Sequence, residues 1–126
     1  KLVFWDGLKL DALPRLTAAA VYDYAVNAGP VPSVKSLQQA CNFYPHKALF
    51  LDGRLGPKTR AAVADIAGND ARDLILAQRV TNSRRAFYRG LAAADPTHPL
   101  AGWLNRCDAL DRYLTRLAAH PEGVAA

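Results

Sequence analysis

Apolar side chains recur at the three- and four-residue spacing of α-helices over most of the chain, and no segment of useful length alternates like a strand. A first helix is predicted to open at Pro14, because proline suits the first helical position, and to end at Gly29-Pro30. Ser33 is the predicted N-cap of a short second helix. The inward positions are Thr17, Ala20, Tyr24 and Asn27 in the first helix, and Val34, Leu37 and Cys41 in the second.

The second half of the chain predicts three more helices after a loop over residues 42–51. One begins at Pro57 and ends near Gly68, and a longer one is capped by Asn69 or Asp70 and broken by residues 95–99. The predicted inward stripes are Leu76, Val80, Phe87 and Leu91 in the long helix, and Trp103, Cys107, Leu110, Leu114 and Leu117 in the last. The predicted fold class is therefore all-α, with about five helices.

The composition is typical of one soluble globular domain, and the chain carries a net positive charge. The 126 residues are 51% hydrophobic, and a net charge of +5 favours a polyanionic partner: nucleic acid, an anionic membrane surface or the bacterial envelope. No run approaches the roughly 18 apolar residues of a membrane span. Most arginines of the last two helices, among them Arg84, Arg85 and Arg89, are expected on solvated faces, with salt bridges to Asp73, Asp108 or Asp111.

The cysteines and histidines indicate neither a metal nor a catalytic site. Cys41 and Cys107 lie on apolar stripes and are predicted to be buried thiols rather than a disulfide, and the three histidines lack the spacing of zinc ligands. No histidine is paired with a plausible nucleophile. We therefore expect no metal and no cofactor.

Two segments carry candidate chemistry. Asp23 and Asn27 lie one helical turn apart, so a carboxylate and an amide share a face that could bind sugar hydroxyls or an N-acetyl group, although the same residues could simply shape the helix end. The second segment is a glycine-rich turn before a helix start, which is a poor match to a phosphate loop and is first of all a turn. Its residues of interest are Asp52, Gly53, Gly56, Pro57 and Thr59.

The ordered combination of several short motifs resembles the glycoside hydrolase family 108 muramidases, lysozyme-like proteins once described as secretion activators. The motifs are Phe4-Trp5-Asp6, Leu13-Pro14, the segment from Tyr22 to Gly29, Leu37-Gln38, the segment from Asp52 to Thr59, Arg85-Ala86-Phe87-Tyr88 and the segment from Gly102 to Arg106. The resemblance implies a lysozyme-like helical domain. Residues 1–30 would end its catalytic region, and residues 31–126 would form the family's predicted peptidoglycan-binding region, packed as one unit with the first. It also implies a glycan-cleft wall built by Asp23, Tyr24 and Asn27, while residues 37–63 resemble the peptidoglycan-binding region most closely.

The family's catalytic glutamate has no counterpart in this chain. The resemblance places it in a Glu-Gly-Gly-Tyr motif before the position of Trp5, but ten of the eleven acids here are Asp, and the single Glu is Glu122 in the tail. A glycosidase needs a carboxylic acid of raised pKa to protonate the leaving oxygen. Because the chain starts at Lys1 and lacks Met, we expect the catalytic glutamate to lie in a segment upstream of Lys1. The absence of that segment should leave an apolar groove near Trp5, Val21 or Tyr22.

The sequence thus predicts the C-terminal portion of a peptidoglycan hydrolase, an N-acetylmuramidase or endolysin that acts on β-1,4-linked glycan strands in the periplasm or at the cell wall. This chain would bind peptidoglycan and have no catalytic residue of its own. Two alternatives stay open. One is a stand-alone peptidoglycan-binding module. The other, less favoured, is a small basic nucleic-acid binder that uses Arg84, Arg85 and Arg89.

Overall fold

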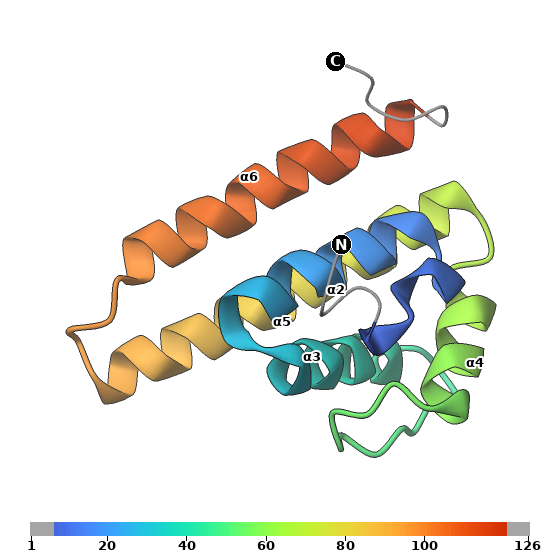
Figure 1. Ribbon diagram of the computed structural model, residues 1–126, viewed down its shortest axis with the longest axis horizontal. Helices are drawn as coiled ribbons and strands as arrows, with labels where there is room; N and C mark the ends of the chain where they lie inside the picture. The colour runs from blue at the N-terminus through green and yellow to red at the C-terminus, as the bar shows by residue number, and fades with distance from the viewer. Residues whose placement is uncertain (1–6, 121–126) are drawn as a thin grey trace.

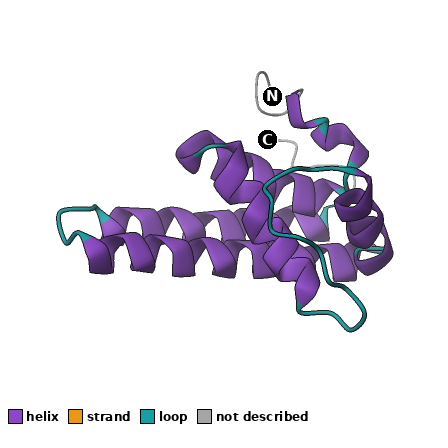
Figure 2. Ribbon diagram, turned by 90° about the horizontal axis from the view of Figure 1, so that it is seen from below, coloured by secondary structure: helices purple, strands orange, loops and turns teal. Residues whose placement is uncertain are grey.

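The computed structural model describes residues 7–120, and all the regular secondary structure in this range is helical (Figures 1 and 2). This confirms the predicted fold class. The elements are one 3-10 turn, η1 (Leu10–Ala12), and five α-helices, namely α2 (Arg15–Ala28), α3 (Pro30–Asn42), α4 (Pro57–Ile66), α5 (Asp70–Ala94) and α6 (Leu100–Ala119).

Several residues that the sequence analysis singled out lie outside the described residues, namely Lys1, Phe4, Trp5, Asp6 and Glu122. The structure therefore does not test the expectation that a catalytic glutamate lies upstream of Lys1, and this stays a prediction. The same holds for the part of the expected apolar groove that was assigned to Trp5.

Helix α2 lies at the centre and contacts α3, α5 and α6, while the short α4 packs against α3 and α5. The two longest helices, α5 and α6, form a hairpin whose connecting loop projects from the rest of the molecule (Figure 2). The main core is apolar and draws on every helix, whereas a second cluster at the α2–α5–α6 junction is aromatic. Its fully or nearly buried members are Tyr24, Tyr88 and Cys107, with Trp103 packed against them.

Proline and glycine mark the helix boundaries largely as predicted. Helix α4 begins at Pro57, and Asn69 caps α5 by accepting a hydrogen bond from the backbone N–H of Arg72 at 2.9 Å. The prediction for Ser33 was wrong. Gly29, at a φ of 93°, ends α2 and lets α3 begin at once with Pro30, so Ser33 lies inside the first turn and donates to the Pro30 carbonyl.

The long helix α5 buries a different stripe from the predicted one. Leu76 and Val80 are buried as expected, but Phe87 is 37% exposed, which corrects its assignment to the core. The buried stripe contains polar residues, and Arg84, which was expected on a solvated face, has no exposed surface. The buried positions of α5 are Asp73, Leu76, Ala77, Val80, Thr81, Arg84 and Tyr88.

The last helix follows the predicted stripe, and both thiols are buried. Cys107, Leu110 and Leu114 of α6 are buried. Cys41 and Cys107 are free cysteines, as predicted, and burial raises the pKa of the Cys41 thiol to about 11. At neutral pH this thiol is therefore protonated and unreactive.

A buried carboxylate from α5 caps the start of α2. Pro14, the N-cap residue of α2, provides no side-chain hydrogen bond, so the first N–H groups of the helix need another acceptor. Asp73 supplies it: its carboxylate accepts from the backbone N–H groups of Leu16 and Thr17, each at 2.9 Å, and from the Thr17 hydroxyl at 2.6 Å. Asp73 was expected to pair with an arginine, and instead it ties α5 to the central helix.

Replacing Asp73 by Ala should destabilise the fold far more than the same change at Asp70. We expect D73A to lower the free energy of unfolding by about 2–4 kcal/mol, because three buried donors lose their charged acceptor. D70A removes a carboxylate from the same first turn of α5. Asp70 is exposed, with a 3.5 Å contact to Arg15, so D70A should cost at most about 0.5 kcal/mol. Urea unfolding followed by circular dichroism measures both, and equal losses would contradict the capping role.

Candidate functional site

The described surface is hollowed along the seam between α3 and α5. Two adjoining cavities of about 510 and 450 Å³ lie there, each within the size range of small-ligand sites, and they share Gln39, Ser83 and Ala86 as walls. We call this feature the α3–α5 groove. Its first end is lined further by Asn42, Phe43, Arg79 and Asn82, and its second end by Tyr24, Val31, Pro32, Lys35, Ser36, Leu51 and Phe87.

A line of hydroxyl groups forms the floor of the groove. The Tyr24 and Ser36 hydroxyl oxygens are 3.4 Å apart, Ser83 Oγ lies 3.1 Å from that of Ser36, and the Ser83 hydroxyl donates to Gln39 Oε1 at 2.7 Å. Burial raises the pKa of Tyr24 to about 12, so this hydroxyl stays protonated at neutral pH. The floor is therefore uncharged and bonded to itself.

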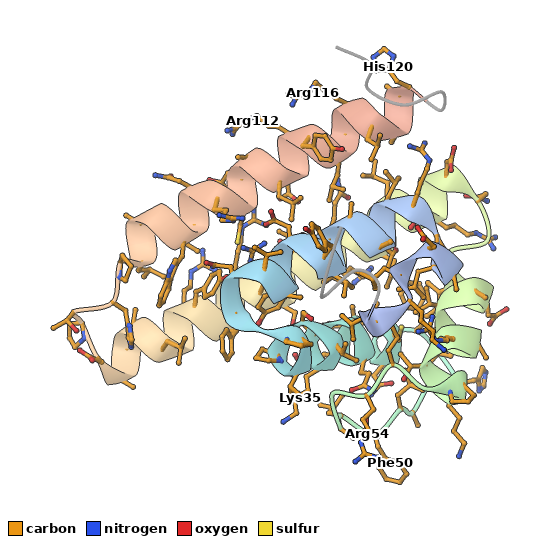
Figure 3. All side chains as sticks on the ribbon, in the orientation of Figure 1. Lys35, Phe50, Arg54, Arg112, Arg116 and His120 are labelled. Atoms are coloured by element: carbon orange, nitrogen blue, oxygen red, sulfur yellow. The ribbon has the colours of Figure 1, made fainter. Side chains whose placement is uncertain are left out.

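Exposed aromatic rings and cationic side chains form the rim. Phe43 is 74% exposed at the first end, where the Arg79 guanidinium lies 5.5 Å from the Phe43 ring centre and 5.4 Å from that of Tyr44. These ring contacts hold Arg79 by cation–π attraction. At the second end Phe87 packs near Tyr24, at 6.1 Å between ring centres, and Lys35 extends outward (Figure 3).

The three predicted cleft-wall residues, Asp23, Tyr24 and Asn27, do not line a common surface. Tyr24 has no exposed surface and contributes to the groove floor. Asp23 and Asn27 share a face, as their spacing predicts, but that face points to α5 and α6, where Asn27 Nδ2 donates to the Tyr88 hydroxyl at 2.6 Å. Sugar binding by Asp23 and Asn27 stays a prediction. Val21 is fully buried and cannot line the groove expected near it.

Asp23 is engaged by two arginines from different helices. Its carboxylate accepts from Arg84 Nη1 at 2.6 Å and from Arg106 Nη2 at 3.2 Å. The Arg84 guanidinium contacts both the Tyr24 and Tyr88 rings, 5.2 and 5.4 Å from their centres, and these two rings also contact each other at 6.0 Å. Burial alone would lower the pKa of Arg84, but its hydrogen bonds to Asp23 and Tyr88 outweigh burial and raise the pKa. Arg84 is thus a permanent cation inside the fold.

The glycine-rich turn is folded around the side chain of Gln38, which is 1% exposed. Gln38 Nε2 donates to Asp52 Oδ1 at 2.9 Å, to the Arg54 carbonyl and to Thr59 Oγ1, and Gln38 Oε1 accepts from the Gly53 N–H at 3.1 Å. The hydrogen bond from Gln38 holds the pKa of Asp52 below its ordinary value. The turn is therefore a scaffold that fixes the α3–α4 connection, including Leu51 at the groove, and a direct binding role for it stays a prediction.

Several groove residues were missed by the sequence analysis. Gln39, Phe43 and Arg79 were not singled out, and the adjacent Phe43-Tyr44 pair just after a helix was the available signal. Within residues 7–120, no group of three metal-binding side chains is arranged around a common point. None of the helices in that range has both the length and the apolar character of a membrane span.

The two glycines of the turn should respond differently to Ala. Gly53 has a φ of 73°, and an added Cβ would lie 2.7 Å from Val31 Cγ1, whereas Gly56 has a φ of −91° and open space around it. We expect G53A to lower the free energy of unfolding by about 1–3 kcal/mol, because both strain and crowding oppose the new side chain. G56A is the matched control and should change it by about 0.5 kcal/mol or less. Urea titration of both variants is the measurement, and a neutral G53A would contradict the described turn.

Most residues that line the groove lie in a segment that matches a family of known proteins. The family model of the Predicted Peptidoglycan domain matches residues 32–108, a range that holds all groove residues except Tyr24 and Val31. No curated protein and no solved structure gives a significant match. Because the family match covers more than half of the chain, the protein belongs to the predicted peptidoglycan domain family.

Proposed function

We propose that the protein binds peptidoglycan in the α3–α5 groove and serves as the recognition part of a cell-wall hydrolase. Family membership supports peptidoglycan as the partner and the cell wall as the place of action. The observation that carries the proposal is the groove itself, which combines exposed rings with amide and hydroxyl groups within the matched residues.

The chemistry of the groove suits an amino-sugar polymer. The rings of Phe43 and Phe87 can pack on the apolar faces of sugar rings, while Gln39 and Asn82 offer amide groups to acetamido and hydroxyl groups. The net charge of +5 attracts the anionic wall at long range, an effect that salt weakens. Short-range contacts in the groove then decide what is bound.

The muramidase part of the proposal rests on the family resemblance and assigns the chemistry to a general acid upstream of Lys1. A glycosidase acid needs a raised pKa. Among the described carboxyl groups, the resolved shifts, at Asp52, Asp65 and Asp95, are all downward and arise first from hydrogen bonds donated by Gln38, Lys47 and Thr97. Asp23 is paired with Arg84 and Arg106. A lowered pKa is the opposite of what a general acid needs, so Asp52, Asp65 and Asp95 do not match that role.

Two of the three arginines that the nucleic-acid alternative assigns to phosphate contacts already have carboxylate partners within the protein. Arg84 is fully buried against Asp23, and Arg85 is paired with Asp108 at 2.7 Å and with Asp111 at 2.6 Å. Neither guanidinium is therefore free for a backbone phosphate, whereas Arg89 is exposed.

Replacing Phe43 by Ala should weaken retention on purified sacculi by about tenfold, because the groove loses its most exposed ring. The matched control is F50A: Phe50 is 84% exposed on the α3–α4 connection and lines neither cavity (Figure 3). F50A should bind within about twofold of the parent protein. Co-sedimentation at several salt concentrations gives the affinities. Equal losses for both variants, or retention on duplex DNA alone, would contradict the proposal.

The 126-residue chain by itself should bind cell walls without cleaving them. We expect the turbidity of a cell-wall suspension to stay level after addition of the chain, because the chain lacks the family's Glu-Gly-Gly-Tyr motif and the resolved pKa shifts, at Asp52, Asp65 and Asp95, are downward. A lysozyme added in parallel provides the positive control. Clearing by the chain at a rate near that of the lysozyme would refute the assignment of the acid to a segment upstream of Lys1.

A further inference from the structure

The α3–α5 groove offers free hydrogen-bond donors and positive charge, while each of its side-chain amide oxygens already accepts a hydrogen bond from a described residue. We infer that it takes the carboxylate-bearing unit of peptidoglycan, a muramyl sugar with its stem peptide, rather than the bare glycan strand. This inference rests on the proposed function and names the ligand class of the same site.

The amide oxygens of the groove are already used inside the protein. Asn82 Oδ1 accepts from Arg85 Nη1 at 2.8 Å, and a guanidinium can only donate, so the Asn82 amide must present its nitrogen elsewhere. Gln39 Oε1 accepts from Ser83, and Asn42 uses both its oxygen and its nitrogen on Leu49. Within the described part of the chain, the amide nitrogens of Asn82 and Gln39 have no acceptor, so they are available to a ligand.

The two cations of the groove are likewise without carboxylate partners among residues 7–120. Arg79 contacts ring faces through its guanidinium, and no ion pair involves Arg79 or Lys35 in that range. None of the described Asp residues lines either cavity. By contrast, the structural arginines Arg15, Arg84 and Arg85 all have an aspartate within 3.5 Å. One cation stands at each end of the groove, with the Gln39 and Asn82 amides beside the first.

This arrangement selects for acceptor groups. A sugar hydroxyl donates as readily as it accepts, and an acetamido group brings one donor and one acceptor, so a bare glycan gains little from a groove of donors. A carboxylate only accepts, and its hydrogen bonds to charged donors are stronger than neutral ones. In peptidoglycan the free carboxylates belong to the stem peptides carried by muramic acid. The acetamido sugar would lie on the rings and amides, and a stem carboxylate would meet Arg79 or Lys35.

The test compares three soluble ligands by isothermal titration calorimetry: N-acetylmuramyl-L-alanyl-D-glutamate, the same compound with its carboxyl groups amidated, and chitotetraose. We expect the first ligand to bind at least about tenfold more tightly than the other two, because those two lack the charged hydrogen bond from a ligand carboxylate to Arg79 or Lys35. R79Q should weaken binding of the first ligand and leave the amidated ligand unchanged. R112Q, which removes an exposed arginine on the outer face of α6 (Figure 3), is the matched control and should change neither.

The outcomes separate this inference from the proposed function. If chitotetraose or the amidated ligand binds as tightly as the carboxylate form, or if R79Q and R112Q act alike, the inference is overturned, while loss of sacculus binding in F43A would still uphold the groove as the site. If F43A also retains full sacculus binding, the proposed function is contradicted as well as the inference. Circular dichroism spectra of R79Q and F43A matching that of the parent protein ensure that each loss reports on binding.

Discussion

The ion pair between the buried Arg84 and the partly buried Asp23 is the constraint on which the packing of the central helices depends. Arg84 comes from α5 and has no exposed surface, while Asp23 comes from α2 and also reaches Arg106 of α6. A buried guanidinium without its carboxylate would cost about 3–5 kcal/mol, so packings of these helices that separate Arg84 from Asp23 are disfavoured. The rings of Tyr24 and Tyr88 both contact the cation, and the Tyr24 hydroxyl lies 3.4 Å from that of Ser36. The Tyr24 hydroxyl is the start of the groove floor, so the geometry of the binding surface is set from within the core.

Local backbone chemistry explains which helix boundaries could be predicted from the sequence and which could not. Helix boundaries could be predicted because they rest on local chemistry: Pro57 opens α4, Asn69 caps α5, and Gly29 with Pro30 separates α2 from α3. The start of α3 was placed wrongly, since a helix can begin directly on Pro30 without the cap that Ser33 was predicted to provide. The apolar stripe of α6 is continuous and was also predicted correctly.

The stripe of α5 could not be predicted from hydrophobicity, because three of its buried positions are polar. Asp73, Thr81 and Arg84 are buried only because α2 supplies their partners or because they bond to their own helix, and those long-range partners are invisible in a local pattern. Phe87, an apolar residue close in register, was therefore assigned to the core in place of Arg84. Part of the candidate site was lost by the same error, since Phe87 lines the groove. Gln39 and Arg79 could not be identified as binding residues from the sequence. Their proposed role depends on which of their polar groups have no protein partner after folding.

The cations of the described chain differ in whether an aspartate pairs with them, and this difference bears on how the net charge acts. Arg84 and Arg85 link helices and have their charge neutralised locally by aspartates, whereas Arg60 donates to the backbone carbonyls of Leu8, Lys9 and Leu55. The net charge of the chain is +5, and the described cations without an aspartate partner include Arg79 and Lys35, which flank the groove. A field of this kind draws the protein toward any polyanion, and salt screens it. What distinguishes one polyanion from another must come from short-range geometry, and the groove brings rings, free amide donors and an unpaired cation within one ligand's reach.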